Sequence, residues 1–350
     1  METFESLVRA EFAPKNTFLN TASNGLLPAR TVAALDRAVR MRAEGIPLGP
    51  LYEDVETVRA SVARLAGVPV GRVAAGASVA EFGALIAAAL PAGAEVLIAE
   101  ADFASLVNPF HMRGDLKVRS VPLERLAESV RAETALVAVS AVQSADGRLA
   151  DLAALRGAAR ARGARLYVDA SQSIGWLPID PDDYDFLAAV GFKWLLGPHG
   201  VAFFVVPEDL GDLTPLLAGW VAGEVPWDSC YGPVEQLARS ARRFDMSPAL
   251  FTHAGLRASL GLIEELGVAA VHTHDVALAD RFRAGLRDLG HEPVPAPGSA
   301  IVSVPGLGGH QPGLSTRGIE VSDRAGNLRA AFHLYNTPDD VDRLLAALSD

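Results

Sequence analysis

The sequence contains very little cysteine and very little lysine. Cys230 is the single cysteine among 350 residues, so the chain cannot form an internal disulfide or a multi-cysteine zinc site. We therefore expect a reducing compartment, the cytoplasm. Lys15, Lys117 and Lys193 are the only lysines among 31 basic residues of the Lys and Arg types. Chemistry that requires a lysine amine has three candidate positions.

Long apolar runs and an excess of basic charge are also absent. No window offers the roughly 18 uninterrupted apolar residues of a membrane helix, and the acidic start of the chain, Met1–Glu5, does not resemble a signal peptide. The 42 acidic and 31 basic side chains give a net charge of -11 and a pI near 5.2. Because such a surface repels phosphates, we expect neither a membrane nor a nucleic-acid partner.

Hydrophobic residues make up 50% of the chain, which is enough for a large buried core. Between residues 26 and 206, short apolar runs alternate with longer amphipathic stretches, a pattern that predicts an α/β domain with a mainly parallel sheet. The predicted strands are Glu95–Ala99, Lys117–Val121, Ala135–Ser140, Arg165–Asp169, Phe186–Val190 and Val201–Val206. The predicted helices are Arg30–Glu44, Glu53–Ala66, Val79–Leu90, Leu123–Ala132 and Asp151–Arg162.

The pattern changes after Pro207 and predicts a shorter α+β end. Its predicted helices are Pro248–Leu266 and Ala269–Leu289, and its predicted strands are Ala300–Val304 and Arg329–Leu334. A last helix is predicted over Thr337–Leu348, with Thr337 as N-cap before Pro338. A domain boundary is predicted within Arg242–Pro248. We expect a large domain over residues 26–245 and a small one over residues 246–350.

Lys193 occupies an unusual place for a lysine, since it follows an apolar strand and lies among aromatic and aliphatic residues in Gly191–Gly200. Burial of an ammonium is costly, and an amine with a lowered pKa is what Schiff-base formation requires. A lysine that extends to solvent is the alternative. Asp169 ends another apolar strand, at the sheet edge where binding crevices form. The two residues could form an ion pair or anchor pyridoxal phosphate.

Two segments carry a resemblance to a known family. Val168–Ser173 (VDASQS) and Gly191–Pro198 (GFKWLLGP) resemble the cofactor site of the class V aminotransferases, a family of fold type I pyridoxal phosphate enzymes. Cysteine desulfurases, isopenicillin N epimerase-like proteins, kynureninase and carbon-sulfur lyases belong to it. The resemblance extends from Phe18–Gly25 to Arg329–Thr337. It implies a sheet of the seven-stranded type, residues 1–25 folded over the active site, and a homodimer with its sites at the subunit interface.

The resemblance also implies roles at the cofactor, pyridoxal 5'-phosphate. Lys193 would form the Schiff base, Asp169 would hold a proton on the pyridine nitrogen, and Gln172 would donate to the phenolic oxygen. Gln172 could equally make a loop hydrogen bond. Phe103 aligns with the ring that stacks on the cofactor, although a core phenylalanine is the competing interpretation.

The phosphate would be held where Gly76, Ala77 and Ser78 open a helix, because free backbone amides and the helix dipole favour an anion there. Ser78 as an ordinary N-cap is an equally good interpretation. Desulfurases place a hydroxyl residue and a histidine at positions that read Val190 and Phe192 here. Phosphate binding would therefore depend more on backbone amides, on Ser78 or on a neighbouring subunit.

At the substrate, Arg329 corresponds to the arginine that grips the α-carboxylate with two parallel hydrogen bonds. A strand arginine is ordinarily a surface salt-bridge partner, which is the alternative. Asn24, Gln143 and Ser144 are secondary substrate-binding candidates. The segment 217–233, which contains three aromatic residues, is where we expect a neighbouring subunit to contribute; these residues are Trp220, Trp227 and Tyr231.

The reaction is narrowed by the missing cysteine. Desulfurases carry a mobile cysteine shortly before the substrate arginine, but residues 318–327 contain none, and Cys230 lies far upstream. A persulfide-forming desulfurase is therefore disfavoured. We expect a transferase or lyase of the class V aminotransferase type that acts on a small amino acid by transamination or by C-S or β-lyase chemistry. The alternatives are an epimerase or racemase, a cysteine desulfurase without the usual persulfide cysteine, and a catalytically silent pyridoxal phosphate-binding protein. No metal site is expected.

Overall fold

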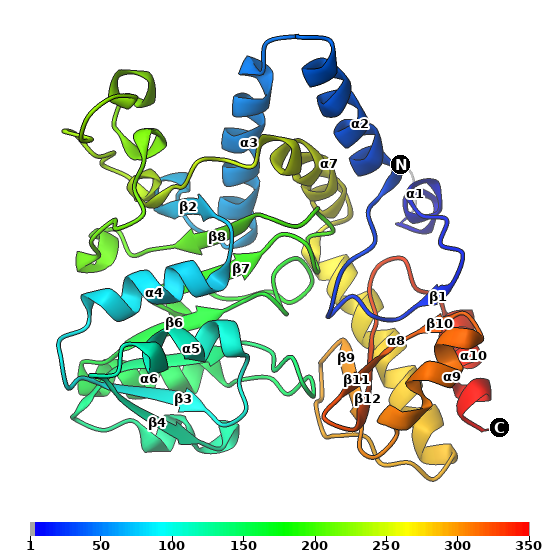
Figure 1. Ribbon diagram of the computed structural model, residues 1–350. Coiled ribbons are helices and arrows are strands. Elements are labelled where there is room, and N and C mark those ends of the chain that lie inside the picture. Colours follow the sequence, from blue (N-terminus) through cyan, green and yellow to red (C-terminus); the bar gives the residue numbers. More distant parts are fainter. Residues whose placement is uncertain (1–3, 350) are drawn as a thin grey trace.

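A seven-stranded sheet forms the centre of the larger part of the molecule (Figure 1). The computed structural model describes residues 4–349. The strand order is β2-β8-β7-β6-β5-β3-β4. The strands are β2 (Val73–Gly76), β3 (Glu95–Ala99), β4 (Lys117–Val121), β5 (Thr134–Ser140), β6 (Arg165–Asp169), β7 (Phe186–Val190) and β8 (Ala202–Val205). Only β8 runs antiparallel to its neighbours, so the predicted fold class is confirmed.

Helices cover both faces of this sheet. One face packs under α3 (Gly49–Leu65), α6 (Leu152–Arg162) and α7 (Leu250–Leu266), and the other under α4 (Val79–Ala89) and α5 (Ala104–Met112). Neighbouring residues of β5 alternate between the two cores: Val137 and Val139 face one, and Leu136 and Ala138 face the other. The chain's first helices are α1 (Phe4–Glu11) and α2 (Ala29–Ala43), and α2 lies beside α7 (Figure 1).

The C-terminal part is built on a three-stranded antiparallel sheet in the order β11-β12-β9. Its elements are α8 (Val268–Asp288), β9 (Ile301–Val304), α9 (Gln311–Thr316), β10 (Ile319–Glu320), β11 (Ser322–Arg324), β12 (Asn327–Ala331) and α10 (Pro338–Leu348). Thr337 caps α10 with its hydroxyl, as the sequence predicts. The N-terminal strand β1 (Thr17–Phe18) pairs with β10, which ties residues near the start of the chain to this part.

The packing of α7 bears on the proposed domain boundary near residue 246. Leu256, Leu260 and Ile263 of α7 belong to the core beneath the large sheet. The division into residues 26–245 and 246–350 therefore remains a proposal, with α7 packed against the large-sheet side.

Several elements differ from the sequence prediction. Residues 123–132 form two short 3-10 turns, Leu123–Arg125 and Ala127–Ser129, instead of a helix. Leu123, Leu126 and Val130 are buried, and their helix-like spacing explains the wrong prediction. The sequence analysis also missed β2, which is short, and α5, which contains Pro109 in its interior. It did not predict the short elements α1, α9, β1, β10 and β11. The strand predicted at Arg329–Leu334 begins and ends earlier, at Asn327–Ala331.

An ion pair closes the outer edge of β2. Arg59 and Asp245 are both buried and meet with Nη2 and Oδ2 2.6 Å apart. Asp245 Oδ1 accepts a hydrogen bond from the Ala75 amide at 2.8 Å, and the Met246 amide donates to the Ala75 carbonyl at 3.2 Å. Arg59 Nη1 also donates to the Val73 carbonyl at 2.9 Å.

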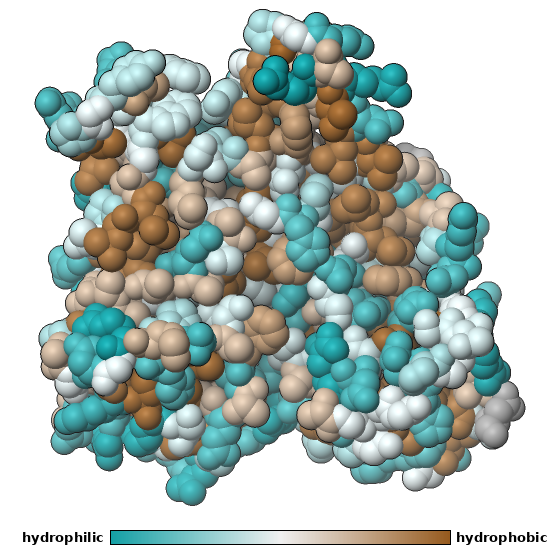
Figure 2. All heavy atoms as spheres, viewed as in Figure 1, coloured by the Kyte–Doolittle hydropathy of each residue, from teal (hydrophilic) through white to brown (hydrophobic). Residues whose placement is uncertain are grey.

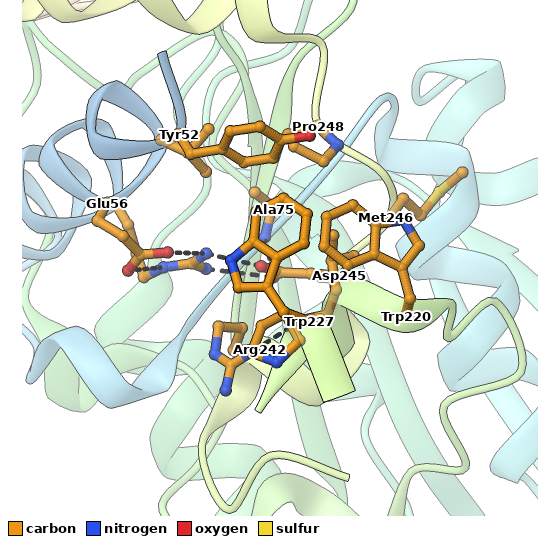
Figure 3. Close-up of a pocket in the computed structure, with 13 residues that line it drawn as sticks. Tyr52, Glu56, Ala75, Trp220, Trp227, Arg242, Asp245, Met246 and Pro248 are labelled. Carbon is orange, nitrogen blue, oxygen red and sulfur yellow. Dashed lines mark hydrogen bonds and ion pairs between the residues drawn. The ribbon is translucent and has the colours of Figure 1, made fainter. Parts of the chain in front are cut away.

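Figure 3 shows a pocket of about 170 Å³ beside this ion pair. The rings of Tyr52, Trp220 and Trp227 surround it, with centroids 4.8 to 6.2 Å apart. Trp220 and Trp227 come from two short 3-10 turns, Trp220–Ala222 and Pro226–Ser229. The pocket contains no lysine or cysteine, and we assign no reaction to it.

Candidate active site

A cavity of about 290 Å³ lies at the carboxyl ends of β6 and β7. Its character comes from six residues in six separate segments of the chain: Ser23, Ser78, Phe103, Asp169, Lys193 and Arg329. Such a crevice at the carboxyl ends of parallel strands is where α/β proteins bind ligands. The structure thus brings most of the predicted site residues together in one cavity.

Lys193 lies in the loop that follows β7 and is only 7% exposed. Burial lowers the pKa of its amine to about 8, against the opposing effect of Asp169, and Arg329 and Arg324 lower it further. Its Nζ lies 5.1 Å from the centroid of the Phe103 ring. Far more of this amine is therefore neutral near physiological pH than for a lysine at the ordinary pKa of 10.5, as a nucleophilic lysine requires.

Asp169 is the last residue of β6 and is buried. Burial raises the pKa of its carboxyl group, while the hydrogen bond from Ser171 and the charge of Lys193 act in the opposite direction. The Ser171 amide donates to Oδ1 at 2.8 Å. Oδ2, the second carboxylate oxygen, has no hydrogen-bond partner among the described residues, and Asp169 lines the cavity. This arrangement suits a partner for a protonated ring nitrogen.

Phe103 precedes α5 and is 45% exposed, so it is not a core residue. Its backbone amide donates to Asp102 Oδ1 at 2.7 Å. Asp102 also accepts from the Ser140 amide, the Ser140 hydroxyl and Gln143 Nε2, at 2.9, 2.6 and 3.1 Å. Gln143 does not line the cavity. Its observed contact supports the placement of Phe103, and a direct substrate role for Gln143 stays a prediction.

Gln172 is buried, and its side-chain amide is fully bonded. Nε2 donates to the Ala22 carbonyl at 2.9 Å and to Ser144 Oγ at 3.0 Å, while Oε1 accepts from Trp194 Nε1 at 2.8 Å. Donation to a cofactor oxygen would require one of these bonds to Nε2 to be exchanged. The predicted role of Gln172 thus stays a prediction, and its observed contacts join the N-terminal segment to the lysine loop.

The start of α4 is compatible with both predictions made for it, a phosphate site and an ordinary helix N-cap. Ala77 and Ser78 line the cavity, and Ser78 is the N-cap of α4. The carboxylate of Glu81 accepts hydrogen bonds from the amides of Ala77 and Ser78, at 2.9 and 3.4 Å. A Cβ atom at Gly76 would lie 2.8 Å from the Phe82 ring, so glycine permits this close packing. A phosphate bound here would have to replace the Glu81 carboxylate.

Arg329 on β12 is 1% exposed and lines the cavity. It donates to the Ser144 carbonyl and hydroxyl and to Ser23 Oγ, the last at 2.9 Å. Its Nε is buried without a hydrogen-bond partner, and no carboxylate within residues 4–349 pairs with it. Burial, followed by the charge of Arg324, lowers its pKa to about 9. A buried guanidinium without a counter-ion is suited to a ligand carboxylate.

The N-terminal segment lies against the lysine loop. The Gly25 amide donates to the Phe192 carbonyl at 2.9 Å, and a Cβ atom at Gly25 would lie 2.2 Å from the Lys193 carbonyl oxygen. Only glycine allows this approach. Asn24 contacts His199 at 2.6 Å through Oδ1 and is exposed outside the cavity lining, so its substrate role stays a prediction.

Sequence reasoning missed three parts of this site. Arg324 lines the cavity, Ser23 accepts from Arg329, and His333 supports the lysine loop from behind through the Trp194 carbonyl. Arg324 is one of 28 arginines, and nothing in its local sequence distinguishes it from a surface residue.

Comparison with known proteins identifies the family. The family model described as aminotransferase class-V matches residues 49–344. The chain belongs to the class V aminotransferase family. An uncharacterised aminotransferase of Bacillus subtilis (strain 168), YcbU, is 30% identical over 83% of this chain and 81% of its own length. Isopenicillin N epimerase of Streptomyces clavuligerus is 30% identical over 94% of this chain and 93% of that protein.

A solved structure supports the same fold. The complex of a cystine C-S lyase with its reaction product cysteine persulfide superposes with a TM-score of 0.87 at 22% identity, and covers 96% of this chain and 98% of that one. As a class V aminotransferase, the chain is an enzyme that uses pyridoxal 5'-phosphate. The residues present fit this cofactor, because one cavity combines a buried amine, a buried carboxylate and an exposed aromatic ring.

Two further observations concern the described residues, 4–349. None of their helices is long and apolar enough to cross a membrane. They also contain no cluster of three or more His, Cys, Asp or Glu side chains that could hold a metal ion.

Proposed function

We propose that this class V aminotransferase acts on a small amino acid by transamination or by C-S or β-lyase chemistry, with the cofactor attached to Lys193. The observation that carries the proposal is Arg329, a buried guanidinium with no carboxylate partner in the described residues, in the same cavity as the Lys193 amine. An α-amino acid supplies the missing carboxylate and places its Cα bonds near the lysine.

The chain's own residues divide the work. When bound, the cofactor supplies a carbonyl carbon for the substrate amine and a conjugated ring that accepts the electron pair released at Cα. Asp169 would hold a proton at the pyridine nitrogen, and Phe103 would cover one face of the ring. Arg329 would fix the carboxylate, and the Lys193 amine would take the Cα proton and return it.

The cavity favours a reaction that needs one proton-transfer group. Its titratable lining residues, within the described part of the chain, are Lys193, Asp169, Arg324 and Arg329. Only Lys193 combines a pKa of about 8 with the proposed position beside Cα. Inversion of Cα through two separate bases would require a second such group. We therefore prefer transamination or lyase chemistry over epimerisation.

A persulfide mechanism lacks its nucleophile. Cys230 is exposed, follows the turn Pro226–Ser229 and does not line the cavity. The hairpin that precedes Arg329 is a tight connection between β11 and β12 and contains no cysteine. The exposed thiol also agrees with the expected reducing compartment, and we propose the cytoplasm.

We further propose that the chain forms a homodimer through the face that carries segment 217–233. Figure 2 shows apolar side chains gathered on the upper part of one face, around α2 and α3 and beside this segment. The large hydrophobic residues exposed in α2, directly after it and in segment 217–233 are Val32, Val39, Ile46, Leu217, Val225, Trp227 and Tyr231. A patch of this kind is typical of a protein interface. Sedimentation of the holoenzyme tests the assembly, and a monomer at all concentrations would contradict it.

One experiment tests the proposed function. Protein loaded with pyridoxal 5'-phosphate is treated with borohydride and digested, and we expect the reduced cofactor on Lys193 but not on Lys15 or Lys117. The loaded enzyme is then screened against amino acids, including cysteine conjugates, with product analysis. A keto acid or pyruvate supports the proposal. An inverted amino acid would establish epimerisation instead, and bound amino acids without any product would establish a silent binding protein.

A further inference from the structure

A second guanidinium group lies in the cavity beside Arg329. Arg324 is the last residue of β11, and Ser322 pairs with Arg329 across the hairpin. Because side chains alternate along a strand, Ser322, Arg324 and Arg329 lie on the same face of the hairpin. Arg324 and Arg329 both line the cavity that contains Lys193. Neither the mechanism above nor the resemblance uses Arg324.

One hydroxyl group holds the two guanidinium groups together. Arg324 Nη2 and Arg329 Nη2 each donate to Ser23 Oγ at 2.9 Å. Arg324 also donates from Nη1 to the Asp323 carbonyl at 2.8 Å. Within residues 4–349, the hydrogen-bond partners of the two arginines are serine hydroxyls and backbone carbonyls, with no carboxylate among them. Arg324 is exposed, so its guanidinium has an open side at the mouth of the cavity.

The charge of the cavity opposes that of the whole chain. Its lining contains three basic residues, Lys193, Arg324 and Arg329, and one acidic residue, Asp169. The chain as a whole carries a net charge of -11. The guanidinium groups of Arg324 and Arg329 carry like charges and repel each other, and bound anions would offset this repulsion. One α-carboxylate satisfies Arg329 and leaves Arg324 available.

We propose that Arg324 binds a second anionic group of the substrate, so that the preferred substrate is an α-amino acid with a carboxylate or sulfonate on its side chain. Arg329 takes the buried α-carboxylate, and Arg324 takes the side-chain anion at the mouth of the cavity. This inference rests on the proposed function. It names a specificity-determining residue in a site where Lys193 does the chemistry.

Matched pairs of amino acids test the inference on the holoenzyme. The visible absorbance of the bound cofactor is titrated with L-aspartate against L-asparagine and with L-glutamate against L-glutamine. We expect at least one acid to bind about tenfold more tightly than its amide, the effect of one charge-assisted hydrogen bond. Arg324→Gln should remove this preference, so that each acid binds about as tightly as its amide. Arg281→Gln is the control, because Arg281 is an exposed arginine paired with Asp342 outside the cavity.

A second measurement needs no cofactor. Succinate, a dicarboxylate, should raise the Tm of the cofactor-free wild type more than propionate does, and Arg324→Gln should abolish the difference. If amino acids leave the spectrum unchanged while succinate still stabilises through Arg324, the proposed function fails and the anion site stands. If wild type shows no preference for acids, or if Arg324→Gln weakens acids and amides equally, Arg324 does not read a second anion and the inference is overturned.

Discussion

The imidazole of His333 contacts the backbone carbonyl of Trp194, with Nε2 and the oxygen 3.1 Å apart. A carbonyl oxygen only accepts, so Nε2 carries a proton. Nδ1 lies 2.8 Å from Asp275 Oδ2, and both residues are fully buried. Burial raises the pKa of Asp275, and His333 opposes this shift. A buried pair from the C-terminal part of the chain thus holds the residue next to Lys193.

Removal of one member of this pair should cost more than removal of both. His333→Leu leaves the Asp275 carboxylate buried without its partner, and we expect a loss of about 3 kcal/mol in the free energy of unfolding. The double variant His333→Leu with Asp275→Leu should recover part of this loss, because no charge then remains buried. Urea unfolding of the three proteins measures both values. Equal stability of the single and double variants would contradict the prediction.

The reactivity of Lys193 should depend on pH in a window set by its pKa of about 8. Below that pH the amine is protonated and unreactive, and above it the neutral amine reacts, so modification of Lys193 should rise through pH 8 and then level off. Pyridoxal with cyanoborohydride, followed by mass spectrometry of the cofactor-free protein, measures the rate. The exposed Lys15 and Lys117 are internal references. Arg324→Gln should move the midpoint upward, and an unmoved midpoint would argue against the charge effect.

Arg329 should be needed for substrate but not for stability. Burial lowers the pKa of its guanidinium to about 9, which means that the charged form is disfavoured in the folded protein. We expect Arg329→Met to fold with a Tm at least equal to that of wild type, and to lose about two orders of magnitude in apparent affinity for amino acids. Thermal unfolding and spectral titration measure the two effects. A strongly destabilised variant would instead assign Arg329 a structural role.

A substitution at Glu81 distinguishes a phosphate site at the start of α4 from an ordinary N-cap. If the cofactor phosphate binds at Ala77 and Ser78, it competes with the Glu81 carboxylate, so Glu81→Gln should tighten pyridoxal 5'-phosphate binding by about two- to fivefold. Pyridoxal without phosphate should bind the two proteins equally. Unchanged phosphate affinity in Glu81→Gln would mean that the phosphate binds elsewhere.

The large sheet was predictable because its strands are continuous apolar runs. Glu95–Ala99, Arg165–Asp169 and Phe186–Val190 have the predicted bounds, since strands buried on both faces carry a strong signal. Lys117–Val121 also has the predicted bounds, although it is the exposed edge strand of the sheet. The helix predicted at 123–132 is absent because Leu123, Leu126 and Val130 have the spacing of a helix face but lie in a series of 3-10 turns.

The candidate site was predictable only where a rare residue type or a motif drew attention. Scarcity identified Lys193, and strand position identified Asp169. Arg324 was missed because its significance comes from a hydroxyl 301 positions away in the sequence, Ser23. The bonds that Gln172 makes to Ala22, Ser144 and Trp194 were equally hidden, because their partners lie 150, 28 and 22 positions away in the sequence.

The Arg59–Asp245 ion pair has a consequence for how two copies of the chain can associate. β2 is an outer strand of the large sheet, and unpaired backbone groups on such a strand invite another chain to add a strand. Here the groups of Val73 and Ala75 are already bonded to Arg59, Asp245 and the Met246 amide. Sheet extension between copies is therefore blocked at this edge. Association on this side of the molecule has to use side chains, which restricts it to a partner of complementary shape and protects the chain from open-ended aggregation.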